Sequence, residues 1–216
     1  MKPTLLFYCE PSQNPDQSIG SWAVAHALSP TFHVVLVTGG EPPAGMEARP
    51  AIDVVRLPPP ERGPADTGMV WPHGWPPGSA RASRTRILLD TFFLSEPAVV
   101  VTELFPFGHE AFTDEILPML EYAAAARRRS LAGAGPRRPL VICSVPDMPD
   151  RARRNRTDDD RARQFADSFY DAILLHGDPR LATFDEAFGP RTEMRVPATQ
   201  TCSSRRSLGQ FVTSAS

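Results

Sequence analysis

The sequence predicts a Rossmann-like α/β fold, with a mostly parallel sheet of about seven strands in a three-layer α/β/α arrangement. Three observations lead to this prediction. Strand-like apolar segments alternate with segments of helical periodicity, several strand segments are apolar on both faces, and polar residues follow where these segments end. The 216 residues, 41% of them hydrophobic, suffice for one substantial core.

The expected strands are rich in β-branched and apolar residues. They span Thr4–Tyr8, His33–Thr38, Ile52–Leu57, Ala98–Thr102, Leu140–Ser144, Ala172–Leu175 and Glu193–Val196. If the second and third strands extend the sheet to one side of the first, a right-handed crossover places the fourth strand on the other side of the first. The switch point then lies between the loop after Tyr8 and the loop that contains Glu103, where ligands bind in open α/β sheets.

Segments between the strands carry apolar stripes at helical spacing. One stripe comprises Phe112, Ile116, Met119, Leu120 and Ala123, and a later one comprises Ala162, Phe165, Ala166 and Phe169. A helix is also expected near Ser79–Leu94, whereas Pro58–Gly78 is too rich in proline for a strand or helix and is expected to be a long loop. We expect residues 1–197 to form the domain and residues 198–216 to form an irregular, disordered polar tail.

Composition argues against several classes of partner. The formal net charge is −2 and the arginines are interleaved with acids, so we expect no nucleic-acid partner. No apolar run approaches the roughly 20 residues of a membrane span, and the N-terminus lacks a signal-peptide pattern, so we expect a cytoplasmic protein, with peripheral membrane contact left open. Cys9, Cys143 and Cys202 lie far apart, so we expect neither a metal site nor a disulfide framework.

Several common catalytic signatures are missing from the sequence. The first expected strand is not followed by G-x-G-x-x-G, and the chain contains no phosphate-binding P-loop, no G-x-S-x-G elbow and no H-E-x-x-H pair. A nicotinamide-dependent oxidoreductase therefore has only the fold class in its favour, and fold alone is weak evidence for function. We expect no cofactor.

Glu103 is the first candidate site residue, because it ends an apolar strand and is soon followed by Pro106 and Gly108. Its position at the carboxyl edge of the sheet suits a residue that binds a sugar hydroxyl or acts as a general base. The structural alternative is a carboxylate that accepts hydrogen bonds from the following turn.

Further candidates follow other expected strands. His176 directly follows an apolar strand and could exchange protons near neutral pH, although His176-Gly-Asp-Pro179 is also good turn chemistry. Asp147 has the same two interpretations, as a turn former or a ligand contact. His109 could cap the next helix or reach the ligand edge, and Phe105 could offer stacking surface or pack in the core.

Taken together, several motifs resemble those of a known family. They are Leu5-Leu-Phe-Tyr-Cys9, Thr38-Gly-Gly-Glu41, Leu57-Pro-Pro59, Val101-Thr-Glu-Leu-Phe-Pro-Phe-Gly108, Cys143-Ser144 with Asp147, and His176-Gly-Asp-Pro179. The chain from residue 3 to about 197 resembles the N-terminal domain of predicted bacterial and archaeal GT-B glycosyltransferases, distantly similar to the lipid-linked N-acetylglucosaminyl transferase of peptidoglycan synthesis. The resemblance implies an acceptor crevice lined by Glu103, Asp147 and His176, and catalysis without a metal.

Two departures from the family qualify that expectation. Where such proteins carry a glycine-rich G-x-G-H before the first helix, this chain has Asn14-Pro-Asp-Gln17, which closes or repurposes the approach of a ligand. The resemblance also implies a second, donor-binding domain, for which this sequence has no residues. We therefore expect the acceptor-binding half of a glycosyltransferase, truncated or split from a separate donor subunit and inactive alone.

These expectations define one candidate site and two functions. The candidate catalytic residues are Glu103 and His176, and the candidate acceptor-binding residues are Asn14, Gln17, Glu103, Phe105, His109, Asp147 and His176. The partner is a glycosyl acceptor of unknown identity. The alternative function is a degenerate, non-enzymatic binding or regulatory module derived from a glycosyltransferase.

Overall fold

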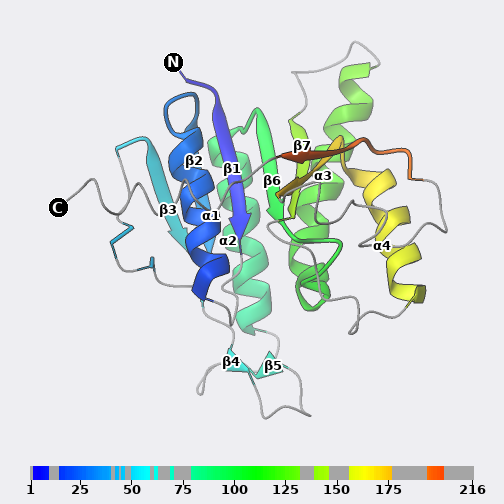
Figure 1. The fold of residues 1–216 in the computed structure, drawn as a ribbon, viewed down its shortest axis with the longest axis horizontal. Coiled ribbons are helices and arrows are strands. Elements are labelled where there is room, and N and C mark those ends of the chain that lie inside the picture. Colours follow the sequence, from blue (N-terminus) through cyan, green and yellow to red (C-terminus); the bar gives the residue numbers. More distant parts are fainter. Residues whose placement is uncertain are drawn as a thin grey trace.

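The computed structural model contains a seven-stranded, wholly parallel sheet with helices packed on both of its faces (Figure 1). It describes residues 2–9, 15–39, 42–43, 45–46, 50–58, 61–62, 69–70, 79–131, 139–145, 156–176 and 194–201. The Rossmann-like α/β fold expected from the sequence is therefore confirmed.

The large sheet has the order β3-β2-β1-β6-β7-β8-β9. Its strands are β1 (Thr4–Cys9), β2 (His33–Thr38), β3 (Ile52–Arg56), β6 (Val99–Glu103), β7 (Leu140–Val145), β8 (Ala172–His176) and β9 (Ala198–Thr201). The second and third strands extend the sheet to one side of β1, and β6 pairs with β1 on the other side. The expected reversal of strand order between β1 and β6 is thus confirmed.

The helices divide unequally between the two faces of the sheet. They are α1 (Pro15–Leu28), α2 (Ser79–Ser95), the short 3₁₀ helix η1 (Glu110–Phe112), α3 (Thr113–Leu131) and α4 (Arg156–Phe169). One core cluster packs α2, α3 and α4 against β1, β2, β6, β7 and β8, and a second packs α1 against β1, β2, β3 and β6. Both predicted apolar stripes face the first of these clusters.

The structure corrects two expectations about local structure. The last strand is Ala198–Thr201 rather than Glu193–Val196, so four residues assigned to the tail pair with β8. The expected long loop contains a two-stranded antiparallel sheet, β4 (Glu61–Arg62) and β5 (Met69–Val70). Strands this short cannot be predicted from sequence periodicity, because two residues show no alternation of polar and apolar side chains.

Figure 1 shows β4 and β5 on the side of the molecule toward which the arrowhead of β1 points. This small sheet is therefore associated with the carboxyl edge of the large sheet, where ligands bind in open α/β folds. Among the described helices, none has the length and apolar character needed to cross a membrane.

Candidate functional site

A row of polar side chains follows the carboxyl edge of the sheet on the face that α1 covers. Thr38 pairs with Cys9, and Glu103 pairs with Ser144. In the sequence these residues alternate with side chains of the opposite face, so the sheet, rather than any local motif, aligns them. We call Thr38, Cys9, Glu103, Ser144 and His176 the polar row.

Glu103 is buried, with a relative exposure of 2%. Ser21 of α1, itself buried, donates a short hydrogen bond to Glu103 Oε1. The carboxylate raises the pKa of the Cys143 thiol on the neighbouring strand, although burial is the larger cause of that rise. Glu103 is thus a desolvated acceptor held between β6 and α1.

The chain turns sharply just after Glu103. Leu104 has a φ of 63°, and its N–H donates to the carbonyl of Ser144 over 2.7 Å. Gly108 lies against Leu104, and a Cβ on Gly108 would come within 2.6 Å of Leu104 Cδ2. A side chain at Gly108 would therefore require the side chain of Leu104 to shift.

Phe105, expected among the acceptor contacts, lies in the core at 2% exposure. Its ring packs edge-on against Phe165 of α4, with ring centroids 5.1 Å apart. The ring therefore offers no surface at the sheet edge, and the core-packing alternative describes it. The turn after Glu103 carries the side chain to the opposite face from the polar row.

His176 ends β8 and is partly buried. Its Nε2 lies 2.9 Å from Ser144 Oγ, and Thr201 of β9 is its register partner. Burial lowers the pKa of the imidazole below its ordinary value of 6.5, which favours the neutral ring. The place of His176 at a strand end predicted a site residue, whereas no such signal in the sequence pointed to Ser144.

The structure describes some of the other expected site residues but not all of them. His109 precedes η1 with a φ of 60° and packs its ring near Phe112 in the loop after β6. Gln17 lies in the first turn of α1. Asn14 and Asp147 lie outside the described residues, and so do Trp71 and Trp75.

The opposite face of the same edge holds a buried ion pair that sequence analysis missed. Arg84 of α2 is fully buried and donates to both carboxylate oxygens of Glu115, over 2.5 and 3.0 Å. Tyr8 donates to Glu115 Oε1 over 2.9 Å, and Arg84 donates to the carbonyl of Pro58 over 2.6 Å. Arg84 also lies over the ring of Phe112, 5.2 Å from its centroid.

A second buried network lies beside this ion pair. The hydroxyls of Thr102 and Tyr170 are 2.8 Å apart, and both lie 3.0 Å from the carbonyl of Phe105. Burial raises the pKa of Tyr170 well above its ordinary value. Thr102 and Glu103 are consecutive residues, yet one fixes the turn after β6 and the other joins the polar row.

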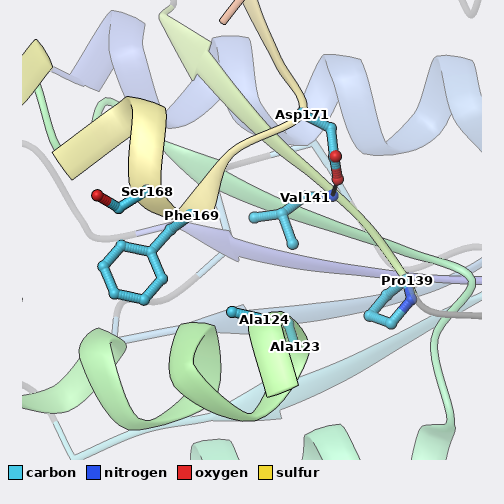
Figure 2. Close-up of a pocket in the computed structure, with 7 residues that line it drawn as sticks. All are labelled: Ala123, Ala124, Pro139, Val141, Ser168, Phe169 and Asp171. Atoms are coloured by element: carbon cyan, nitrogen blue, oxygen red, sulfur yellow. Dashed lines mark hydrogen bonds between the residues drawn. The ribbon is translucent and has the colours of Figure 1, made fainter. Parts of the chain in front are cut away.

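A small cleft lies far from the polar row, between α3, α4 and the start of β7 (Figure 2). Its volume is about 10 Å³, which is room for about one water molecule. Its lining includes Val141 and Asp171, whose carboxylate accepts the N–H of Val141. The cleft belongs to the amino edge of the sheet and is too small for a sugar.

Chemically, the polar row provides a carboxylate, a neutral imidazole and hydroxyl groups on one face of the ligand edge. Such groups form directional hydrogen bonds with a polar ligand. Among the described residues, no group of three or more His, Cys, Asp or Glu side chains is arranged to hold a metal ion.

The chain has a GT-B-like fold. UDP-N-acetylglucosamine 2-epimerase from Rickettsia bellii aligns over 99% of this chain and 48% of its own, with a TM-score of 0.51 and 11% identity. Sucrose-phosphate synthase from Thermosynechococcus elongatus aligns over 98% of both chains, with a TM-score of 0.45 and 11% identity.

Anabaena HepE, solved with UDP-glucose, aligns over 99% of this chain and 50% of its own, with a TM-score of 0.45 and 9% identity. Neither a family model nor a curated protein matches the sequence. The chain thus spans about half the length of the epimerase and of HepE. At these identities the likeness establishes the fold alone.

Proposed function

We propose that this domain is the acceptor-binding half of a glycosyltransferase that takes its sugar from a nucleotide-sugar donor. The observation that carries the proposal is the polar row, which lines one face of the carboxyl edge beside the point where strand order reverses. The GT-B-type fold and the share of the epimerase chain that is matched support it. Transfer then requires a donor-binding domain, and this domain alone is inactive.

Glu103 serves first as a binding residue in this proposal. Its burial and the hydrogen bond from Ser21 hold one carboxylate oxygen in a fixed position. A fixed, desolvated carboxylate gives strong, oriented hydrogen bonds to a hydroxyl group. A role as general base for the acceptor hydroxyl is the stronger form of the same proposal.

His176 is the second proposed contact with the acceptor. The neutral imidazole favoured by its lowered pKa suits a group that exchanges hydrogen bonds or a proton near neutral pH. We also propose Asn14, Gln17, His109 and Asp147 as acceptor contacts, because they follow β1, β6 and β7 closely in the sequence.

Two measurements test the proposal. Calorimetry of the purified chain with UDP-glucose and UDP-N-acetylglucosamine should detect no tight binding, since the donor side belongs to another domain. The chain mixed with the donor-binding half of a related GT-B enzyme should then transfer sugar, and Glu103→Ala should abolish transfer without unfolding. Tight nucleotide-sugar binding by the chain alone would contradict the assignment to the acceptor side.

One sequence feature favours a second candidate, a non-enzymatic binding or regulatory module. Asn14-Pro-Asp-Gln17 stands where the family carries G-x-G-H, which removes the glycines and histidine from the loop after β1. Such a module would bind the acceptor class yet support no transfer with any donor half. Replacing residues 14–17 by Gly-Thr-Gly-His separates the two, because only an otherwise intact enzyme half should gain activity.

A further inference from the structure

Leu104, directly after Glu103, lies in a strained turn. Its φ is 63°, a value that a bulky side chain disfavours, and the N–H of Phe105 donates to the carbonyl of Glu103 over 2.7 Å. A hydrogen bond between residues two apart, with a positive φ at the residue between them, defines the rare and strained form of the γ-turn. The leucine is therefore held in a conformation that its own backbone disfavours.

The turn interrupts the alternation of side chains along β6. Val99 and Val101 belong to the core cluster beneath α1, and Glu103 follows them on the same face of the strand. An extended strand would also bring Phe105 to that face, because side chains two residues apart share a face. Phe105 instead lies in the other core cluster, against Phe165 of α4. The turn thus separates Glu103 from an aromatic ring that would otherwise lie beside it.

Contacts on the opposite face of the sheet hold the turn in this conformation. The hydroxyls of Thr102 and Tyr170 both lie 3.0 Å from the carbonyl of Phe105, whose ring is buried. The N–H of Leu104 donates to the carbonyl of Ser144 over 2.7 Å. A strained residue persists only where its surroundings determine its conformation, and such residues cluster at sites that bind or react. The turn after the first candidate site residue meets both conditions.

The side chain of Glu103 has a constraint of its own, because its Oε1 accepts a hydrogen bond from Ser21 of α1. The helix is fixed against the sheet by Trp22 and Ala25, which are buried in the cluster beneath it. The donor thus stands on a packed helix and the acceptor on a strand end that the turn defines. We propose that Leu104 is a positioning residue, whose strained turn aligns Glu103 with Ser21 and holds the carboxylate in one orientation at the ligand edge.

This role deepens the proposed function, and its consequence for sugar transfer rests on that function. A glutamate side chain has three torsions, so one hydrogen bond orients the carboxylate only if the backbone is fixed as well. Leu104→Gly and Leu104→Ala form a matched pair of variants. Both remove the leucine side chain, but only glycine adopts a positive φ without strain and gives the turn access to other conformations.

Urea unfolding of the full chain tests the strain. Where φ is negative, glycine is less stabilising than alanine, and where φ is positive the order is reversed. The folding equilibrium constant of Leu104→Gly should therefore exceed that of Leu104→Ala by at least about threefold. The opposite order would show that the turn is not strained and would overturn the proposal.

Ser21→Ala, introduced into three backgrounds, tests whether the turn positions Glu103. In the wild-type chain and in Leu104→Ala, it should lower the folding equilibrium constant about tenfold, because a hydrogen bond to a carboxylate is lost. In Leu104→Gly the loss should be less than about threefold, since residues that act together have non-additive effects. An equal loss in all three backgrounds would overturn the proposal.

Ser29→Ala is the matched control for this experiment. Ser29 follows the last residue of α1, is buried to a similar extent as Ser21, and donates to the carbonyl of His26 over 2.8 Å. It lies eight residues from Ser21 and does not belong to the polar row. Its substitution should have the same effect in all three backgrounds, and a smaller effect in Leu104→Gly would show that the glycine loosens the whole helix.

A transfer assay with a donor half gives the catalytic readout. Leu104→Gly should lower kcat at least about tenfold with a smaller change in KM, whereas the less stable Leu104→Ala should retain most of the activity. A packing role predicts the opposite order, because activity would then follow stability. If the coupling with Ser21 is found but the wild-type chain transfers no sugar, the proposed enzyme function fails and the positioning of Glu103 stands. Equal transfer by the two variants would refute the role of Leu104 in the reaction.

Discussion

Each face of the carboxyl edge of the sheet holds a buried carboxylate, and the two carboxylates differ in their hydrogen-bond partners. On the face covered by α2 and α3, the carboxylate of Glu115 is paired with Arg84 and bonded by Tyr8. On the face covered by α1, the carboxylate of Glu103 is also buried, and it accepts a hydrogen bond from the neutral hydroxyl of Ser21.

The difference separates a structural charge from a functional candidate. A bidentate ion pair that also bonds a tyrosine and a backbone carbonyl uses its polar groups within the fold. Strongly desolvated carboxylates at the carboxyl edge of a parallel sheet are common at sites that bind or react. The comparison indicates a structural role for Glu115, whereas Glu103 stays the proposed binding residue.

The largest effect is expected on the first of these faces. Glu115→Gln leaves the fully buried Arg84 without its counter-charge, which should lower the free energy of unfolding by about 3–5 kcal/mol. Urea unfolding followed by circular dichroism measures the loss. The double variant Arg84→Met/Glu115→Leu should recover much of it, and a loss below about 1 kcal/mol for the single variant would contradict a structural role.

The hydroxyl network on the same face should give the next largest effect. Tyr170→Phe removes the donor to the carbonyl of Phe105 and the partner of Thr102, so we expect a loss of about 1–3 kcal/mol. Thr102→Val should give a similar loss. The double variant should cost less than the sum of the two, because residues in one network couple; strict additivity would show that the two hydroxyls act separately.

Glu103→Gln is the matched counterpart of Glu115→Gln on the other face. The amide oxygen can still accept from Ser21, and the substitution removes a desolvated charge, so the free energy of unfolding should change by less than about 1 kcal/mol. Sugar transfer with a donor half should be lost. Destabilisation as large as that of Glu115→Gln would remove the distinction between the faces.

The polar row should also make stability depend on pH through His176. Because burial lowers the pKa of the folded-state imidazole below 6.5, the unfolded chain binds a proton first as the pH falls. Stability is therefore fully present above about pH 6.5 and declines below it, until the pH reaches the folded-state pKa. His176→Gln should flatten this part of a thermal-unfolding pH series, and an unchanged series would contradict the lowered pKa.

The smallest effect is expected where neither face is involved. Leu94, near the end of α2, is 86% exposed, so Leu94→Ser should change the free energy of unfolding by no more than about 0.5 kcal/mol. Urea unfolding alongside the other variants sets the baseline. A larger change would show that this side chain is covered in solution.

The local sequence pattern was sufficient to predict the main strands and helices. It was not sufficient to predict where they end or the two-residue strands. The stripe of Ile116, Met119 and Leu120 predicted a buried helix face, and α3 buries all three. Glu193–Val196 carried a strand-like composition, yet β9 begins at Ala198, where β8 offers an unpaired edge. An edge strand gains its hydrogen bonds from its neighbour, so its bounds depend on the sheet.

The sequence by itself determined the alternation of strands and helices, the parallel sheet that follows from it, and the position of Glu103 and His176 at the ends of strands. These features arise from periodicity over a few residues. Only the tertiary structure decided which polar groups meet, because the partners are distant in sequence. Arg84 and Glu115 are 31 residues apart, Ser144 and His176 are 32 apart, and Ser21 and Glu103 are 82 apart. A local sequence pattern cannot predict such pairs. They form because polar groups that are buried need hydrogen-bond partners.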